Sequence, residues 1–272
     1  MTVTKTGVPS AKEFIEAKES TLFSELHEYS NKYLSSNAEI LKLYRWPVDA
    51  LTQWSRIYEY QFCYENLLDQ FDKNLKILDA GCGITFFPFL VDNKFEVECL
   101  DQDDYTNIIN TINLKQNTNI KFTKAPMADT PLESESIDVI FCISVLEHTK
   151  NHREIIKEFH RLLNPGGKII VTFDISLNKE SDFMGIDVDG ALDILDCMSG
   201  LFDMEYSKEN LLEDLNRNNL YTTQYVSNNL DDINLPWPRK RDIKTLIKEN
   251  FFKQQNFTKV DITFCNVVGY KK

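Results

Sequence analysis

The sequence lacks the features that mark membrane, secreted and nucleic-acid-binding proteins. It has no apolar run long enough to span a bilayer and no N-terminal signal peptide, so we expect a soluble, cytoplasmic protein. Basic residues are also outnumbered, with 30 Lys and Arg against 42 Asp and Glu, which gives a formal net charge of −12. Because nucleic-acid binding normally needs a basic face, this balance argues against a nucleic-acid partner.

Paired cysteines are absent as well. None of the six cysteines lies in a Cys-x-x-Cys spacing, and several fall within apolar runs. We interpret them as small buried thiols of a protein from a reducing compartment. The sequence has no internal repeat and no low-complexity linker, and its hydrophobic content of 42% is enough for a sizeable core.

The most informative stretch joins an apolar run, an acid and a glycine-rich turn. Residues 75–78 predict a buried parallel strand, which is followed by Asp79 and then by Gly-Cys-Gly at 81–83. Glycine lets such a turn bend tightly and lets a ligand lie directly against backbone N–H groups. Phe86 occupies the place of a third glycine, which disfavours a site for a dinucleotide pyrophosphate, and Gly-x-Gly alone is a weak signal.

The segments after this turn strengthen the interpretation. A second predicted strand ends in Asp101, 22 positions after Asp79, where a carboxylate can accept both hydroxyls of a ribose. The mostly apolar residues 137–142 come before Val-Leu-Glu-His at 145–148, and Asn-Pro-Gly-Gly precedes an apolar run at 168–171. A strand, a glycine-rich turn and a following helix together make a nucleotide-binding element.

This ordered set of motifs resembles the class I S-adenosylmethionine-dependent methyltransferases, of the small-molecule kind called methyltransferase type 11. The resemblance covers about residues 75–174. It implies an α/β fold, with a Rossmann-like, doubly wound, mostly parallel sheet and an antiparallel C-terminal strand. It also implies S-adenosylmethionine as cofactor and S-adenosylhomocysteine as product. The alternative is another doubly wound fold with an unrelated ligand, since fold alone does not fix function.

The resemblance further implies which residues contact the cofactor. Met127 is expected to pack on the adenine and to offer its N–H, although a loop methionine that fills a gap is the alternative. Many relatives have an acid where this chain has Pro126, so the adenine amino group would be met by Asp129 or by a backbone carbonyl. The implied cofactor-binding residues are Arg56, Asp79, Gly81, Cys82, Gly83, Asp101, Gln102, Met127, Ala128 and Cys142.

The segment Trp-Ser-Arg-Ile-Tyr-Glu-Tyr at 54–60 precedes the first predicted strand by about the length of a helix. A similar Trp-Ser-Arg-x-x-Glu-Tyr segment occurs in some methyltransferases of this kind, ahead of a glycine turn that continues with Thr or Ser and Phe-Pro, as at 85–88 here. Arg56 could pair with the carboxylate of the methionine moiety, because a guanidinium fork suits a carboxylate. The alternative is a surface ion pair with Glu59 or another nearby acid.

The periodicity of the remaining chain predicts one compact domain with an N-terminal helical cap at 1–73 and a methyltransferase core at 74–272. Residues 175–240 are predicted to form an insert on the substrate side. Residues 1–10 lack periodicity and predict a loose tail. The predicted helices are 11–43, 50–68, 86–91, 106–116 with Thr106 as N-cap, 150–163, a short pair within 187–201, a helix capped by Ser207, and 242–254. The later predicted strands are 120–125, 139–143, 168–173 and a terminal antiparallel strand or hairpin within 257–270.

Methyl transfer from a sulfonium leaves three tasks to the protein. It must align donor and acceptor, exclude water, and remove a proton if the acceptor is a hydroxyl. His148 follows the fourth strand, near where the methyl should project, and an imidazole titrates near neutral pH, so it is the candidate catalytic base. Leu-Glu-His is common at this position in the family whatever the substrate, so a supporting role is the alternative. Glu147 is a weaker candidate.

An acidic group follows the fifth predicted strand, and Mg²⁺ prefers such oxygen ligands. These residues are Asp174, Asp182, Asp187 and Asp189. Because they form no spaced ligand motif, we interpret them as charged loop residues of an acidic protein and predict no metal. The predicted function is methyl transfer to a hydroxyl oxygen of a small molecule, and a sugar or nucleotide-linked sugar is one candidate acceptor. The alternatives are N- or C-methylation of another metabolite, or a non-catalytic cofactor-binding partner subunit.

Overall fold

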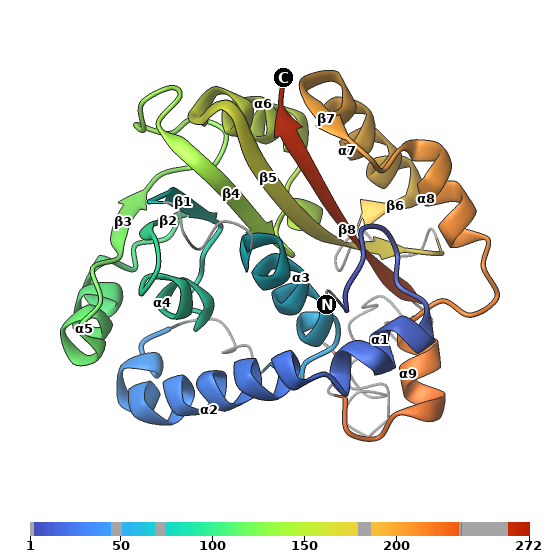
Figure 1. Cartoon of the computed structure of the whole chain (residues 1–272), viewed down its shortest axis with the longest axis horizontal. Helices are drawn as coiled ribbons and strands as arrows, with labels where there is room; N and C mark the ends of the chain where they lie inside the picture. The colour runs from blue at the N-terminus through green and yellow to red at the C-terminus, as the bar shows by residue number, and fades with distance from the viewer. Residues whose placement is uncertain (1–2, 45–50, 69–73, 179–185, 234, 236–260) are drawn as a thin grey trace, which may run out of the picture.

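The strands form one mixed sheet in the order β3-β2-β1-β4-β5-β8-β7, with β6 paired to β5 (Figure 1). The computed structural model describes residues 3–44, 51–68, 74–178, 186–233, 235 and 261–272. Strands β1 to β6 pair with one another in parallel, whereas β8 is antiparallel to both β5 and β7. The predicted fold class is therefore confirmed. The strands are β1 Lys76–Ala80, β2 Glu96–Asp101, β3 Lys121–Lys124, β4 Ile137–Ile143, β5 Leu163–Ser176, β6 Ile186–Asp187, β7 Phe202–Met204 and β8 Ile262–Lys271.

The order of the strands reverses between β1 and β4, the two central strands of the parallel part. From β1 the chain proceeds outward to β2 and β3, and it then returns to β4 on the other side of β1. Ligands of such sheets bind outside the carboxyl ends of the strands at the point of reversal. Ile77 and Leu78 of β1 are fully buried on opposite faces of the sheet, which explains why successive residues of this strand are apolar.

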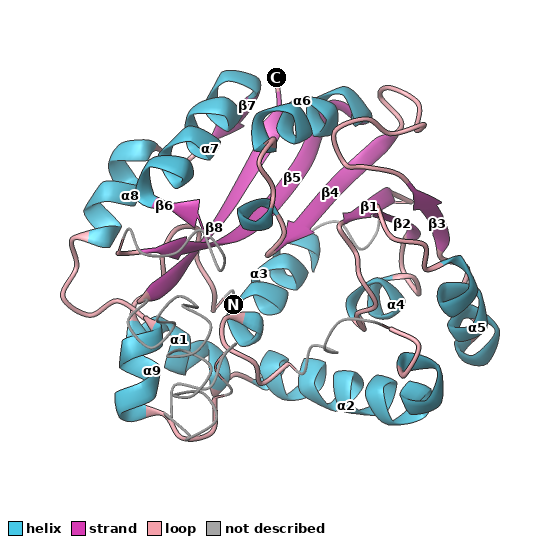
Figure 2. Ribbon diagram, turned by 180° about the vertical axis from the view of Figure 1, so that it is seen from behind, coloured by secondary structure: helices cyan, strands magenta, loops and turns pink. Residues whose placement is uncertain are grey.

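Helices cover both faces of the sheet. The apolar cluster on one face contains residues of α2, α3, α4 and α5, and the cluster on the other contains residues of α6 and α7. Figure 2 shows these helices from behind. Within the described part of the chain, no helix combines the length and the apolar character that a membrane crossing requires. The helices are α1 Ala11–Lys18, α2 Thr21–Leu41, α3 Arg56–Leu68, α4 Phe87–Val91, α5 Thr106–Gln116, η1 (a 3₁₀ helix) Leu146–His148, α6 His152–Leu162, α7 Val188–Leu201, α8 Lys208–Leu215 and α9 Thr223–Asn229.

The N-terminal region differs from its prediction in three places. The helix expected at 11–43 is divided, because the Ser20 hydroxyl accepts a hydrogen bond from the Phe23 N–H and starts α2 anew. The helix expected at 50–68 begins at Arg56, since Trp54 has a left-handed φ of 42°, and residue 50 lies outside the described residues. The expected tail is anchored, because the Glu65 carboxylate accepts hydrogen bonds from the N–H groups of residues 3 and 4.

Two predictions in the core also need correction. Thr106 is not the N-cap of α5; Tyr105 occupies that position, and the Thr106 N–H donates to Asp104 Oδ1 at 3.1 Å. The strand expected at 168–173 already starts at Leu163, directly after α6, so the Gly-Gly bend at 166–167 lies within β5. A shift in the register of β4 against β5 accommodates this bend.

The C-terminal third confirms some predictions and corrects others. Ser207 caps α8 in a reciprocal capping box with Asn210, as predicted, and β8 is the predicted antiparallel strand. The expected helix pair is one helix, α7, whose first turn is capped by the Asp187 carboxylate. The short strands β6 and β7 and helix α9 were not predicted. The helix predicted at 242–254 lies outside the described residues.

Candidate active site

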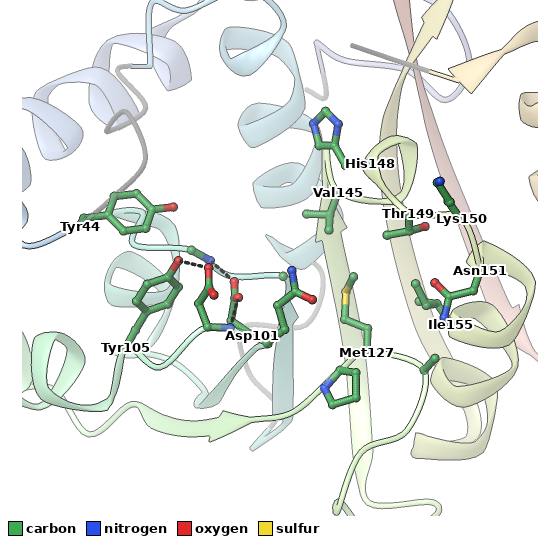
Figure 3. A pocket seen from close by; sticks show the side chains of 16 residues that line it. Tyr44, Asp101, Tyr105, Met127, Val145, His148, Thr149, Lys150, Asn151 and Ile155 are labelled. Carbon is green, nitrogen blue, oxygen red and sulfur yellow. Dashed lines mark hydrogen bonds between the residues drawn. The ribbon is translucent and has the colours of Figure 1, made fainter. Parts of the chain in front are cut away.

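A cavity of about 500 Å³ opens at the carboxyl ends of β1, β2 and β4, where the strand order reverses (Figure 3). The glycine turn and the end of β2 form one wall, and the loops after β3 and β4 form the other. Its lining residues include Tyr44, Gly81, Gly83, Asp101, Gln102, Tyr105, Met127, Ala128, Val145, His148, Lys150, Asn151 and Ile155. Of the residues predicted to bind a cofactor, six lie together here: Gly81, Gly83, Asp101, Gln102, Met127 and Ala128.

The glycine turn folds over the end of β2. The N–H groups of Gly81 and Cys82 both donate to the Leu100 carbonyl, at 2.8 and 3.1 Å. Gly81 and Gly83 have left-handed φ angles of 76° and 48°. A Cβ at Gly83 would lie 2.5 Å from the Tyr44 hydroxyl, so a side chain at this position would fill space between the turn and Tyr44. The turn therefore keeps its backbone open to the cavity.

Asp101 holds this turn and faces the cavity at the same time. Its Oδ2 accepts the Gly83 N–H at 3.0 Å, and its Oδ1 accepts the Asp103 N–H at 3.0 Å (Figure 3). Each carboxylate oxygen has two lone pairs, so both can still accept a hydroxyl from a ligand. Burial raises the pKa of Asp101 above its ordinary value, even though these two N–H groups favour the charged form.

The opposite wall is apolar where it comes from the loop after β3. Met127 and Ala128 line the cavity, and Ile155 of α6 completes this wall. Asp129 is exposed and is not among the lining residues; its N–H donates to the Pro126 carbonyl within the turn. Of the two predicted partners for an adenine amino group, the described geometry therefore disfavours Asp129.

A second cavity, of about 140 Å³, lies on the other side of the glycine turn. Arg56 lines it together with Asp79 and Cys82, and it shares the glycines of the turn with the larger cavity. Arg56 does form the predicted ion pair with Glu59, but the pair is not at the surface, because Glu59 is fully buried. The Arg56 side chain remains 18% exposed and lines this cavity.

Asp79 and Cys142 lie deeper than the resemblance implied. Burial, and secondarily the charge of Asp101, raise the pKa of the Asp79 carboxyl well above its ordinary range. Cys142 is fully buried in the core cluster of the α6 and α7 face and lines neither cavity. Its contact with the cofactor stays a prediction that neither cavity supports. The alternation of β4 places its side chain on the core face, away from the site.

His148 ends η1 and lines the larger cavity. In Figure 3, Val145 lies between His148 and Met127. Packing around the ring and then the positive charge of Arg56 lower the pKa of His148 below its ordinary value, so the imidazole is neutral at pH 7. Glu147 differs: it is buried, and burial and the nearby Asp174 raise its pKa well above the usual range. Glu147 lines neither cavity, which disfavours it as the candidate base.

The acidic group after β5 is dispersed. Asp174 accepts the Trp54 indole N–H at 3.1 Å, Asp187 caps α7, and Asp182 lies outside the described residues. In the described ranges, no group of three or more His, Cys, Asp or Glu side chains is placed to hold a metal ion.

Three further residues shape the site, and two of them, Ser144 and Val145, were missed by the sequence analysis. Ser144 follows β4 with a left-handed φ of 51°, and Val145 after it lines both cavities. Tyr44 closes over Gly83 from beyond the end of α2. Only the glycines offered a signal for these contacts, because a close approach needs a residue without a Cβ.

Residues 78–171 match the family model described as a methyltransferase domain. Phosphoethanolamine N-methyltransferase 3 of Arabidopsis thaliana is 28% identical over 102 residues, which cover 36% of this chain and 20% of the relative. Ubiquinone biosynthesis O-methyltransferase of Rickettsia akari is 30% identical over 115 residues, which cover 41% of this chain and 45% of the relative. The match thus spans less than half of either relative.

Among solved structures, the cyclase SpnF superposes with a TM-score of 0.53 at 14% identity, over 98% of this chain and 99% of that one. An identity this low concerns the fold alone. The family match over residues 78–171 and the strand order together show a class I S-adenosylmethionine-dependent methyltransferase domain in this part of the chain. The cofactor of this family is S-adenosylmethionine.

The residues of the site fit this cofactor. Asp101 presents two carboxylate oxygens at the end of β2, and the turn after β1 leaves its backbone uncovered where a Cβ would intrude. The apolar wall formed by Met127 and Ile155 suits a purine ring, and Arg56 borders the smaller cavity beside the same turn. The ribose, the purine and the carboxylate of the ligand thus each have a nearby residue of suitable chemistry.

Proposed function

We propose that this chain transfers the methyl group of S-adenosylmethionine to a hydroxyl oxygen of a small molecule. The observation that carries the proposal is that a neutral imidazole, His148, lines the same cavity as Asp101 and the glycine turn. Among hydroxyl compounds, we propose sugars and nucleotide-linked sugars as the first class to test. When bound, the cofactor supplies an activated methyl group on a sulfonium.

The described residues divide the binding task among them. Asp101 would accept the ribose hydroxyls, while the backbone of the glycine turn and Gln102 line the space beside it. Met127 and Ala128 would cover the adenine, and Arg56 would hold the carboxylate at the far end of the ligand. A ligand fixed at both ends is aligned for an in-line displacement, which supplies most of the acceleration.

His148 would act on the acceptor. A neutral imidazole has one ring nitrogen with a lone pair, which can accept the hydroxyl proton as the oxygen bonds to the methyl carbon. Its lowered pKa keeps that nitrogen unprotonated at neutral pH. Removal of the proton prevents a positive charge from remaining on the acceptor oxygen after transfer.

The comparisons leave the acceptor atom open. The relatives named above are described as an N-methyltransferase and an O-methyltransferase, and the structural neighbour SpnF is described as a cyclase. N- or C-methylation of another metabolite, or a non-catalytic partner subunit that binds the cofactor, would use the same cavity. These alternatives differ from the proposal in the proton that must be removed and in whether turnover occurs.

The test is release of S-adenosylhomocysteine in the presence of matched acceptor panels. Hydroxyl compounds, primary amines and carbon acids of similar size would be compared at several pH values. Turnover confined to the hydroxyl panel supports the proposal, and turnover confined to amines or carbon acids contradicts it. Cofactor binding by calorimetry without turnover on any panel would indicate the partner subunit. Turnover on RNA would overturn the expectation drawn from the net charge.

A further inference from the structure

Glu59 of α3 is a fully buried carboxylate at the centre of a hydrogen-bond network. Its Oε1 accepts the hydroxyls of Ser144 and Thr172, both at 2.6 Å. Its Oε2 accepts the Ser55 hydroxyl at 2.7 Å and a hydrogen bond from Arg56 Nη1. A buried carboxylate is tolerated when it is paired with a cation and hydrogen-bonded at both oxygens, and Glu59 meets both conditions.

The network joins α3 of the N-terminal region to the end of β4 and to β5. Ser144 lies directly after β4 and Thr172 lies in β5, so the single carboxylate of Glu59 connects both to α3. The network also contains Arg56, whose Nη1 contacts the Ser144 hydroxyl as well as Glu59. The position of the guanidinium beside the smaller cavity is therefore determined by contacts with both the cap and the core.

Ser144 shows how strongly this position is constrained. Its φ of 51° is unfavourable for a residue with a Cβ and persists only where the surroundings enforce it. The Ser144 N–H donates to the carbonyl and the hydroxyl of Thr172, at 3.0 and 3.1 Å, while its own hydroxyl donates to Glu59. The next residue, Val145, lines both cavities, so the network sets the wall between them.

We propose that Glu59 is a positioning residue, which holds the Arg56 guanidinium so that it meets the carboxylate of the cofactor. The inference rests on the proposed function, because it takes S-adenosylmethionine as the ligand. A guanidinium has five N–H donors, so the hydrogen bond to Glu59 and binding of a ligand carboxylate are compatible. The exposed part of Arg56 borders the cavity beside the glycine turn, where the ligand carboxylate would arrive.

The chemistry of the position requires a carboxylate. Glutamine has the same shape but only one acceptor oxygen, and its amide nitrogen would face donors in place of the second oxygen. Glu59→Gln should therefore release either the strand hydroxyls or the guanidinium. Arg56 would lose its fixed orientation, whereas Asp101 and the adenine wall, which lie elsewhere in the site, would keep theirs.

The test compares two ligands of the same protein. S-adenosylhomocysteine carries the amino-acid carboxylate, and 5′-methylthioadenosine lacks it. Calorimetry of Glu59→Gln should show affinity for S-adenosylhomocysteine reduced about 10-fold or more, the range for a lost charge-assisted hydrogen bond. Affinity for methylthioadenosine should change by less than about 3-fold. Arg56→Ala should give the same pattern, and the double variant should be no worse than Arg56→Ala alone, because the two residues act as a unit.

Glu65 provides a matched control on the same helix. It is also a buried glutamate, but its carboxylate accepts hydrogen bonds from residues 3 and 4 and lines neither cavity. Glu65→Gln should lower stability without changing the ratio of the two affinities. If Glu59→Gln does not fold, Thr172→Val removes one donor to Glu59 and should shift the ratio in the same direction.

Equal losses for both ligands, or an unchanged ratio in both Glu59→Gln and Thr172→Val, would assign Glu59 a structural role only and overturn the inference. Because binding is measured without turnover, this result leaves the proposed methyl transfer intact. Conversely, a shifted ratio in a chain that transfers no methyl group would retain the role of Glu59 and refute the proposed function. Failure of the wild-type chain to bind S-adenosylhomocysteine would overturn both.

Discussion

Val145 and Gly81 approach so closely that a side chain at position 81 has no space. A Cβ added to Gly81 would lie 2.7 and 2.8 Å from the two methyl groups of Val145 and 3.2 Å from its Cβ, so rotation of Val145 cannot relieve the contact. Gly81 also has a left-handed φ of 76°. The glycine turn after β1 and the loop after β4 are thus fitted to each other, and the cavity lies against both.

Gly81→Ala would add both backbone strain and overpacking, and Gly166→Ala is a control that measures backbone strain alone. Gly166 has a similar φ of 72°, but an added Cβ would meet nothing within 4 Å. Gly166→Ala should therefore lower the unfolding free energy by about 1–2 kcal/mol, from backbone strain alone. Gly81→Ala should lower it by about 1–3 kcal/mol more, because of the added overpacking, and should weaken cofactor binding. Urea denaturation and calorimetry would measure both effects.

Val145→Ala in the Gly81→Ala background should recover part of the lost stability, since the two substitutions share one contact. If Gly81→Ala and Gly166→Ala lowered the unfolding free energy equally, the close approach of Val145 to position 81 would not contribute to stability.

Cofactor affinity should depend on Asp101. Asp101→Ala would remove two charge-assisted hydrogen bonds to ribose hydroxyls, at a cost of about 2–4 kcal/mol in binding free energy. The Gly83 N–H would also lose its partner, so the turn should become less ordered. Asp104 is a matched control, because its carboxylate accepts the Thr106 N–H but it does not line the cavity. Unchanged affinity of Asp101→Ala in calorimetry would remove this residue from the site.

Asp79 should make the unfolding free energy depend on pH. Its pKa is raised in the folded chain by burial and by Asp101, so the folded state binds more protons than the unfolded state above the ordinary carboxyl pKa of 3.8. The unfolding free energy contributed by Asp79 is therefore greatest below that value and is lost as the pH rises toward the raised pKa, by about 1.4 kcal/mol for each unit of difference. Asp79→Asn should be more stable than the wild type at pH 7.

Urea denaturation at a series of pH values would check this expectation. The difference in unfolding free energy between Asp79→Asn and the wild type should grow from pH 4 upward and then level off. A constant difference across the series would mean that Asp79 is ionised in the folded protein throughout.

The parts of the fold that were predicted correctly are those whose cause is local. The apolar runs of β1 and β4 and the glycine turn between β1 and α4 each carry their signal in adjacent residues. The division between α1 and α2 depends on Ser20. Its φ of −72° and ψ of 154° are extended, so this serine caps α2 and does not continue a helix. A periodic pattern of apolar residues continues across it, so periodicity alone joined the two helices.

The site was predicted where it depends on strand ends and missed where it depends on distant contacts. Asp101 follows from the position of a carboxylate at the end of β2. Glu59 lies 85 positions from Ser144 and 113 from Thr172, and no pattern in the sequence links them. The resemblance implied a contact between Cys142 and the cofactor, but the two-residue period of β4 turns this side chain into the core.

A substitution of His148 would test the proposed mechanism directly. If it is the base, His148→Ala should lower the turnover rate by about 10²–10⁴-fold, the range for a lost general base. Cofactor affinity should barely change, because the ring acts on the acceptor. The rate should fall on the acid side as the imidazole is protonated, and because the pKa is lowered, this limb should lie below the ordinary histidine value of 6.5. Arg56→Met should move the limb to higher pH by removing a nearby positive charge.

His160 is the control for these measurements. Burial also lowers its pKa, but it lies on α6 against Phe202 and lines neither cavity, so His160→Ala should leave turnover and the acid limb unchanged. A His148→Ala variant with near-normal turnover and a raised acceptor KM would refute the role as base. His148 would then position the acceptor, and the acceleration would come from alignment of donor and acceptor by Asp101, Arg56 and the glycine turn.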